Sequence, residues 1–286
     1  MADLRVEDAV IAQALSTPDI AVAAAERTEA AQRLIDRAQH DEAVELRVVS
    51  ALELCVLGGP KYPLFEEDVA YAWQQMGNRR RRKIIQLITE GMVERGLLTE
   101  NNPGTSPRQG APTYSLTPEL GIALAARCRP AFIVIADTAI SSIRSPRLYA
   151  LGDQDESVRA IVVEDPVALP ADKADDFPQV KKFGPLGRMY GYFLVSPGKA
   201  AERLAEWAIA PPPQRPGVDE NSTRMVSRYH PRDGHVSIGV RLTIRGDGTT
   251  ARLDRPRFGG VHGVAGEYDL AGLREVMLDL LTVRPR

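Results

Sequence analysis

The sequence predicts an α+β protein in which helices dominate the first half and a mostly antiparallel sheet dominates the second. Apolar residues recur at helical spacing between residues 79 and 95, and Gly96 follows as a helix stop. In the second half, residues 235–244 alternate apolar and polar side chains, and a Gly-Asp-Gly turn leads into a returning strand. Helices grouped ahead of strands are typical of α+β proteins. We therefore expect three parts: N-terminal helices at 1–42, a helix-rich domain at 43–143 and an α+β domain at 147–286.

The composition is that of an ordinary globular protein, with 44% hydrophobic and 26% charged residues. The acidic N-terminus lacks the pattern of a secretory signal, and no apolar run approaches the roughly 20 residues that span a bilayer. We therefore expect a cytoplasmic protein with no membrane partner. Cys55 and Cys128 lack metal-binding or disulfide spacing, so buried free thiols are expected, with a contacting redox pair as the alternative.

Charge is distributed unevenly along the chain. The formal net charge is −2. Residues 1–45 carry four Lys/Arg against ten Asp/Glu, a balance of −6, whereas residues 78–129 carry nine Lys/Arg against four Asp/Glu, a balance of +5. A local basic face on an otherwise acidic protein favours binding of a polyanion such as nucleic acid.

The centre of this basic segment is predicted to be a helix over 79–95. Its apolar residues form one stripe: Ile84, Ile85, Ile88 and Met92. Asn78 is a favourable N-cap, because its side-chain oxygen can accept a backbone N–H of the first turn. Five consecutive cations at 79–83 occupy the first turns, where the helix dipole is already positive. Because this placement costs stability in isolation, it indicates a bound polyanion.

A hairpin is predicted directly after this helix. Residues 97–100 form a short strand, residues 101–112 are turn formers, and residues 113–117 return as a second strand. Thr117 and Pro118 then start another helix as cap and first helical residue.

The other elements follow from periodicity and from Pro/Gly punctuation. Further helices are predicted at 4–15, 18–40, 42–57, 66–76, 118–127, 197–208 and 269–281. The inner face of the last helix is expected to hold Leu270, Leu273, Val276, Met277 and Leu280. The apolar run at 131–136 suits a buried helix or a strand, and a helix reaching Ile143 is favoured. Strands are predicted at 157–163 and 189–195, with a linker at 144–147, a loop at 165–185 and an extended spacer at 210–217.

The order of helix, short strand, polar tip, returning strand and helix resembles the winged helix-turn-helix domains of bacterial transcriptional regulators. Residues 90–99 carry most of the resemblance, because the recognition helix of that family ends in such a glycine and enters the first wing strand. Residues 114–121 resemble the usual exit from the wing. The resemblance covers about residues 44–130, under a third of the chain, and does not extend to the C-terminal domain.

The resemblance implies sequence-specific binding of double-stranded DNA by a transcriptional regulator that acts as a homodimer. In helix-turn-helix proteins the N-terminal part of the second helix meets base edges in the major groove. The expected DNA-binding residues are Asn78, Arg79, Arg80, Arg81, Arg82, Lys83 and Gln86, with Arg108 at the wing tip. The C-terminal domain is expected to serve dimerisation, effector sensing or partner binding.

Two alternatives remain open. The winged helix can be a protein-docking surface, with the arginines meeting an acidic partner. The second domain can instead hold an active site, with His230, Asp233 and His262 as the convergent set. His230, His235 and His262 could also converge on a metal, with Asp233 as a further ligand, but their spacing matches no recurrent ligand set. Recurrent cofactor, phosphate-loop, hydrolase and zinc motifs are absent from the sequence. We therefore predict no cofactor, no metal and no enzymatic activity.

Overall fold

The computed structural model describes residues 18–40, 43–58, 62–101, 114–138, 146–152, 158–167, 184–211, 223–232, 235–254 and 265–282. The predicted helix at 4–15 and the wing tip at 102–113 lie outside these ranges, as do Arg108, Asp233 and His262. The described helices and strands form an α+β fold, which confirms the predicted class.

The first half holds α2 (Pro18–His40), β1 (Val44–Ser50), α3 (Ala51–Val56), α4 (Glu67–Gln74), α5 (Asn78–Glu94), β2 (Leu98–Glu100), β3 (Tyr114–Leu116) and α6 (Pro118–Cys128). The rest holds β4 (Ile133–Thr138), β5 (Arg147–Leu151), β6 (Ala160–Val167), the 3-10 helix η3 (Gly184–Gly187), β7 (Met189–Val195), α8 (Pro197–Ile209), β8 (Arg224–Arg232), β9 (His235–Gly246), β10 (Ala251–Asp254), β11 (Gly266–Tyr268) and α9 (Leu270–Thr282).

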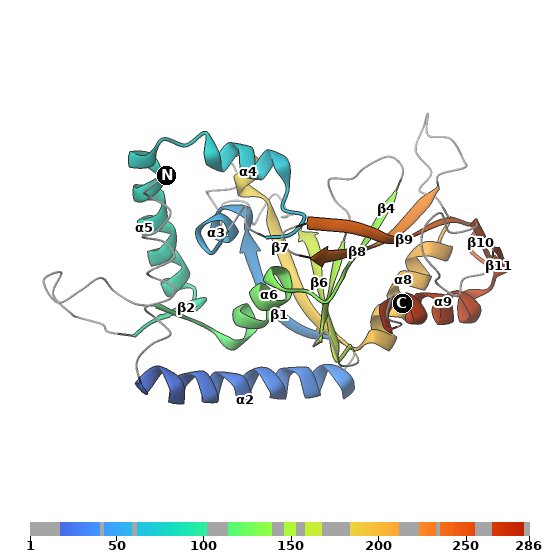
Figure 1. The fold of residues 1–286 in the computed structure, drawn as a ribbon, viewed down its shortest axis with the longest axis horizontal. Coiled ribbons are helices and arrows are strands. Elements are labelled where there is room, and N and C mark those ends of the chain that lie inside the picture. The colour runs from blue at the N-terminus through green and yellow to red at the C-terminus, as the bar shows by residue number, and fades with distance from the viewer. Residues whose placement is uncertain are drawn as a thin grey trace, which may run out of the picture.

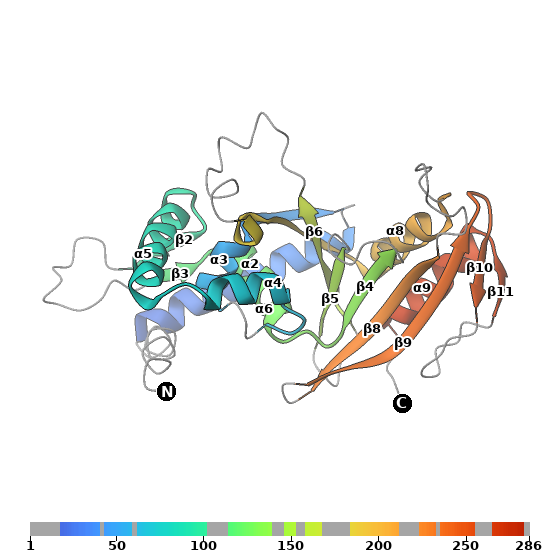
Figure 2. The same ribbon diagram turned by 90° about the horizontal axis from the view of Figure 1, so that it is seen from above.

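Nine strands form one antiparallel sheet in the order β1-β7-β6-β5-β4-β8-β9-β10-β11. The strands β2 and β3 form a separate hairpin. In both views, α5 and the β2–β3 hairpin lie at one end of the molecule, and β10, β11 and α9 lie at the other (Figure 1, Figure 2).

Strand β1 corrects the helix predicted over 42–57. Val44 and Leu46 are buried while Glu45 between them is exposed, and the strand pairs with β7. The helix starts only at Ser50, whose side chain accepts a hydrogen bond from the backbone N–H of Glu53 while the Glu53 carboxylate accepts the N–H of Ser50. This reciprocal capping box stops the strand and begins α3.

Strand β4 corrects the helix predicted from residue 131, whose residues 139–143 lie outside the described ranges. Residues 144–145 of the predicted linker also lie outside them, and Arg147 is the first residue of β5. The β-branched run at Ile133–Ile135 lies between β5 and β8, with ladders to both neighbours. Burial on both faces makes such a strand apolar throughout, so periodicity did not separate it from a buried helix.

The two faces of the sheet belong to two cores. Ile133, Val162 and Leu194 point into a core shared with α2, α3, α4, α5 and α6. Val134 and Ile161 point into a second core shared with α8 and α9. The sheet therefore includes strands from both sides of the predicted boundary at 143–147, and the helical segment packs directly against it (Figure 2).

Most other predicted elements are confirmed within one to four residues, including α4, α5, α6, α8, α9 and the β2–β3 and β9–β10 hairpins. Strand β6 runs to Val167, three residues into the predicted loop, and β8 was not predicted. The inner face of α9 is confirmed except at Leu270, which is 43% exposed. Both cysteines are free thiols, but Cys128 is exposed, contrary to expectation, while Cys55 is buried. Within the described ranges, no helix combines the length and apolarity needed to cross a bilayer.

Candidate nucleic-acid interface

The helices α4 and α5 are joined by the three residues Gln75–Gly77, a length typical of a helix-turn-helix. Helix α4 packs inward through Val69 and Trp73, and α5 packs through Ile84 and Met92. The N-cap of α5 is Gly77, not Asn78 as predicted, and Gly77 provides no side-chain cap. Asn78 is already the first helical residue and is exposed. No acidic side chain lies in the first turn, so its positive end is left uncompensated.

Most of the basic run on α5 faces outward. Arg79, Arg80, Arg82 and Lys83 are exposed, and within residues 62–101 no ion pair or side-chain hydrogen bond engages them. Gly77, Asn78, Arg79, Arg80 and Lys83 line a shallow hollow at the start of the helix. The structure thus places three predicted cations and Asn78 around one hollow, and Arg82 is exposed elsewhere on the same helix.

Arg81 differs from its neighbours. Its guanidinium turns back toward α4 and donates through Nη2 to the carbonyl oxygens of Trp73 (3.1 Å), Gln74 (3.2 Å) and Met76 (3.1 Å). Its central carbon also lies 5.3 Å from the centre of the Trp73 ring. These contacts direct Arg81 into the protein, in contrast to the DNA contact expected from the sequence.

The outward face of α5 changes character along its length. Gln86 is exposed and donates through Nε2 to Glu90 Oε1 at 3.0 Å, one turn further on. Glu90 and Glu94 are exposed on the last turns, and Leu87 is 63% exposed between the two halves. The N-terminal half therefore carries the cations and the C-terminal half carries acids, so only the first half suits a polyanion.

The hairpin after α5 has the position of a wing. Gly96 adopts a left-handed backbone (φ 64°), as predicted, and the N–H of Leu97 donates to the carbonyl oxygen of Met92 at 2.8 Å. The paired residues include Leu98 with Leu116 and Glu100 with Tyr114. Arg108, between the two strands, lies outside the described residues.

The C-terminal end of α5 is fixed to the sheet by Arg95. This side chain forms an ion pair with Glu53 of α3 and donates to the carbonyl oxygen of Val48 on β1 at 2.9 Å. Glu53 is buried and also completes the capping box of α3. The orientation of α5 is therefore set at one end by α4 and at the other by α3 and β1.

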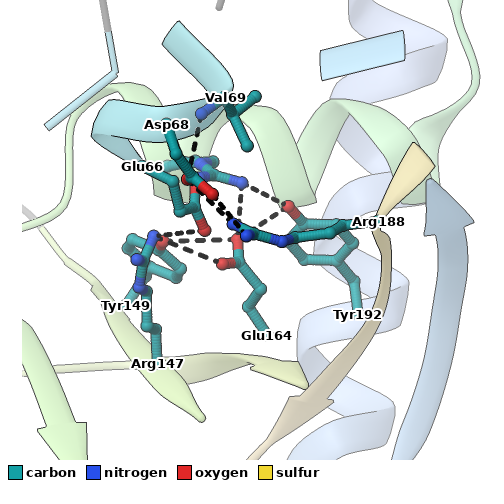
Figure 3. A network of polar contacts seen from close by, with 9 residues as sticks. Glu66, Asp68, Val69, Arg147, Tyr149, Glu164, Arg188 and Tyr192 are labelled. Atoms are coloured by element: carbon teal, nitrogen blue, oxygen red, sulfur yellow. Dashed lines mark hydrogen bonds and ion pairs between the residues drawn. The ribbon is translucent and has the colours of Figure 1, made fainter. Parts of the chain in front are cut away.

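A buried ionic network, which the sequence did not indicate, lies between the helices and the sheet (Figure 3). Arg127 of α6 is fully buried, and its Nη1 lies 2.8 Å from Glu164 Oε2 of β6 and 3.0 Å from the Tyr192 hydroxyl of β7. Its Nη2 lies 3.3 Å from Glu66 Oε2, just before α4. Burial lowers the pKa of Arg127, but Glu164 and the nearby tyrosines raise it more, so the guanidinium stays charged.

A second arginine completes this network. Arg147 Nη1 on β5 lies 3.1 Å from Glu66 Oε1 and 3.7 Å from Glu164 Oε1. The hydroxyls of Tyr149 and Tyr192 donate to Glu164 Oε2 at 3.3 and 2.7 Å. Burial raises the pKa of Tyr149 to about 12. The positive charges of the two arginines balance the negative charges of the two glutamates. The network therefore holds layers of the fold together and needs no charged ligand for charge balance.

Of the residues considered as a metal or catalytic set, Asp233, His262 and the side chain of His235 lie outside the described part of the chain. His230 on β8 and His235 on β9 occupy different rungs of one ladder, where His230 pairs with Ser237 and His235 pairs with Arg232. The His230 ring packs over Gly239, where an added Cβ would lie 2.4 Å from it. Within the described ranges, no three His, Cys, Asp or Glu side chains are grouped to hold a metal ion.

Comparison with known proteins adds no assignment: no protein-family model and no curated protein matches this chain.

Proposed function

We propose that this protein binds double-stranded DNA through the N-terminal half of α5. The observation that carries the proposal is the set of exposed cations at Arg79, Arg80, Arg82 and Lys83, to which the described residues provide no ion pair. They lie on the helix that follows a three-residue turn and precedes a two-stranded hairpin. Helix-turn-helix proteins present this part of their second helix to the major groove.

In this proposal, Arg79, Arg80, Arg82 and Lys83 divide between guanine edges and phosphates. The exposed amide of Gln86 reads an adenine edge when it leaves Glu90. Asn78 and the uncapped N–H groups of the first turn contact a phosphate. Arg108 of the wing contacts the adjacent minor groove or backbone. Glu90 and Glu94 repel phosphates and hold the second half of α5 away from the duplex.

Salt dependence is the first test. DNA fragments are selected from a random or genomic pool, and their affinity is measured between 50 and 200 mM salt. The logarithm of the binding constant falls by about 0.9 per phosphate neutralised for each unit of log salt. We expect Arg79→Ala/Arg80→Ala to weaken binding strongly and to reduce the slope by about two such increments.

The control is Arg33→Ala, which also removes an arginine charge from an exposed position, but on α2. It should leave both affinity and slope unchanged. If the α5 double variant retains wild-type affinity and slope, these cations do not bind DNA.

The roles of cytoplasmic transcriptional regulator and homodimer belong to the same proposal. A dimer would present two α5 helices to half-sites about one helical turn apart. Selected fragments should therefore contain a repeated or palindromic element, and sedimentation should give twice the chain mass of 31.3 kDa. Single half-sites bound by a monomer would remove the dimer from the proposal.

A second candidate function, docking of an acidic protein, is favoured by a different observation. Leu87 on α5 and Tyr71 on α4 are 63% and 65% exposed, large apolar side chains on the same two helices as the cations. Exposed apolar side chains near polar ones are a feature of protein interfaces. Selection from the DNA pool separates the two functions, because a docking surface would enrich no sequence.

A further inference from the structure

Arg81 is the third of five consecutive cations on α5, and the only one of the five whose described contacts turn back into the protein. It is half-buried, and its Nε is enclosed without a hydrogen-bond partner. Its Nη2 bonds carbonyl oxygens five to eight residues earlier in the chain. Arg81 therefore bonds α4 while belonging to α5.

The three carbonyls that Arg81 bonds are those of a helix end. The last four carbonyls of an α-helix have no partner within that helix. Trp73 and Gln74 are the last residues of α4, and Met76 lies in the turn. The guanidinium also lies over the Trp73 indole, and Trp73 is itself buried in the core. One side chain thus caps α4, stacks on its core tryptophan and fixes where α5 begins.

The same device occurs once more in the molecule. The chain has two tryptophans, and the second, Trp207, lies near the end of α8. Arg224 lies 5.2 Å from the centre of the Trp207 ring and donates to the carbonyl oxygens of Ala208 (3.0 Å), Ala210 and Pro211 (3.2 Å). Arg224 lies on β8, far from any basic run, so stacking on a tryptophan and capping its helix is a structural role there.

We infer that Arg81 is a positioning residue for the proposed DNA interface and not a DNA contact. It holds the α4–α5 turn in the geometry that directs Arg79, Arg80, Arg82 and Lys83 outward. The inference rests on the proposed function for its purpose, while the clamp itself is a property of the free protein. We expect a guanidinium to be required, because its plane stacks on Trp73 while its Nη2 donates to the carbonyl oxygens of the turn.

The test compares Arg81→Met, which keeps the apolar stem, with Arg80→Met as a matched control one residue away. Amide hydrogen exchange is followed over residues 75–82, and Trp73 fluorescence is read in a Trp207→Phe background. We expect exchange in the turn to quicken about tenfold in Arg81→Met and to stay unchanged in Arg80→Met. Unchanged exchange and fluorescence in Arg81→Met would overturn the inference.

DNA binding gives the second readout. Arg81→Met should weaken binding about tenfold with an unchanged salt slope, whereas Arg80→Met should lower both the affinity and the slope. Arg81→Met could instead reduce the salt slope of DNA binding as much as Arg80→Met does, while amide exchange in the turn stays normal. That result would make Arg81 a phosphate contact. If the wild-type protein binds no DNA, the proposed function fails, and the exchange result alone still decides whether Arg81 holds the turn.

Arg81→Lys covers the case in which Arg81→Met does not fold. A lysine keeps the charge and can donate to the carbonyls, but it loses the planar group that stacks on Trp73. We expect intermediate exchange in the turn and incomplete recovery of DNA affinity. Full recovery by lysine would overturn the requirement for a stacked guanidinium.

Discussion

Two groups of arginines in this molecule have the same chemistry and opposite surroundings. On α5, Arg79, Arg80 and Arg82 reach into solvent, and the described part of the chain provides them with no carboxylate. Between the helices and the sheet, Arg127 and Glu164 are buried, and the partly buried Arg147 and Glu66 and two tyrosine hydroxyls contact them.

The difference shows that the role of an arginine depends on whether the fold provides it with a carboxylate partner. The buried group is internally balanced, so its cations hold layers of the fold together. The described residues provide the α5 group with no carboxylate partner, which is why we propose an external one.

Removing the buried cation should have the largest effect. Arg127→Met leaves the buried Glu164 and the partly buried Glu66 beside a reduced positive charge, which should cost about 3–5 kcal/mol of unfolding free energy. Urea denaturation measures the loss. Arg80→Met is the control and should change stability by less than about 0.5 kcal/mol. Equal losses in the two variants would abolish the contrast.

Removing both partners together should cost less than the two single changes predict. Arg127→Met/Glu164→Leu leaves no charge of that pair unpaired, whereas Glu164→Leu alone leaves Arg127 with only the more distant Glu66. We expect a coupling free energy of roughly 1–3 kcal/mol in a double-mutant cycle. Strict additivity would show that the pair does not act as a unit.

Alkaline pH should weaken the same region. Burial raises the pKa of Tyr149 to about 12, and burial also raises the pKa of the Cys55 thiol to about 12. Both groups are protonated in the folded and unfolded states at pH 8, so stability is complete there. Above the unfolded values, near 10 for tyrosine and 9 for cysteine, the unfolded chain releases protons first. Stability should therefore fall as pH rises toward 12.

The loss should approach about 1.4 kcal/mol per pH unit for each such group. Urea denaturation at pH 8, 9, 10 and 11 measures it. Tyr149→Phe should make the decline shallower, and Tyr71→Phe, at a 65% exposed position, should leave it unchanged. If the urea denaturation midpoint did not change up to pH 11, it would contradict the raised pKa values of these buried groups.

A partly exposed pair should contribute little. Arg188 donates to both carboxylate oxygens of Asp68, but the two side chains are 28% and 49% exposed. Arg188→Ala should therefore cost only about 0.2–1 kcal/mol, and added salt should narrow the difference from the wild type. A loss as large as that of Arg127→Met would mean that solvent screening does not separate the two sites.

The smallest effect on stability is expected from the α5 cations themselves. Arg79→Ala and Arg82→Ala remove positive charge from the positive end of a helix, so stability should stay within about 0.5 kcal/mol or rise slightly. Thermal unfolding at low salt measures this change. A marked loss of stability would show that these arginines have internal partners.

Local signals in the sequence predicted the elements that depend on local physics. The apolar stripe of α5, Gly96 and the β9–β10 alternation each occupy a short window. The α3 capping box was also visible, because Ser50 precedes Glu53 by three residues, and this spacing would have moved the helix start from 42 to 51. The α5 start was missed by one residue because Gly77 and Asn78 are both acceptable caps.

The features that the sequence did not predict depend on partners that are distant in the chain. Strand β1 pairs with β7, about 145 residues later, and β4 pairs with β8, about 90 residues later. Arg127 is indistinguishable in sequence from a surface arginine on a helix, because its partners Glu66, Glu164 and Tyr192 are 37 to 65 residues away. Likewise, nothing within the run at 79–83 marks Arg81, since its orientation depends on the place of the Trp73 ring.

The position of β1 and β4 in the sheet has a mechanical consequence. The chain leaves the sheet from β1, builds α3 to α6, and returns to the sheet at β4, four strand positions away. At about 4.8 Å per position, the two strands lie roughly 19 Å apart across the sheet. Ile133 at the start of β4 is level with Val44, whereas the chain leaves β1 at Ser50, six residues further along the strand. The two attachment points are therefore roughly 28 Å apart. A segment attached at two separated points resists rotation relative to the sheet more than a segment attached at one point. A shortened protein without this segment would need at least about eight extended residues to join β1 to β4.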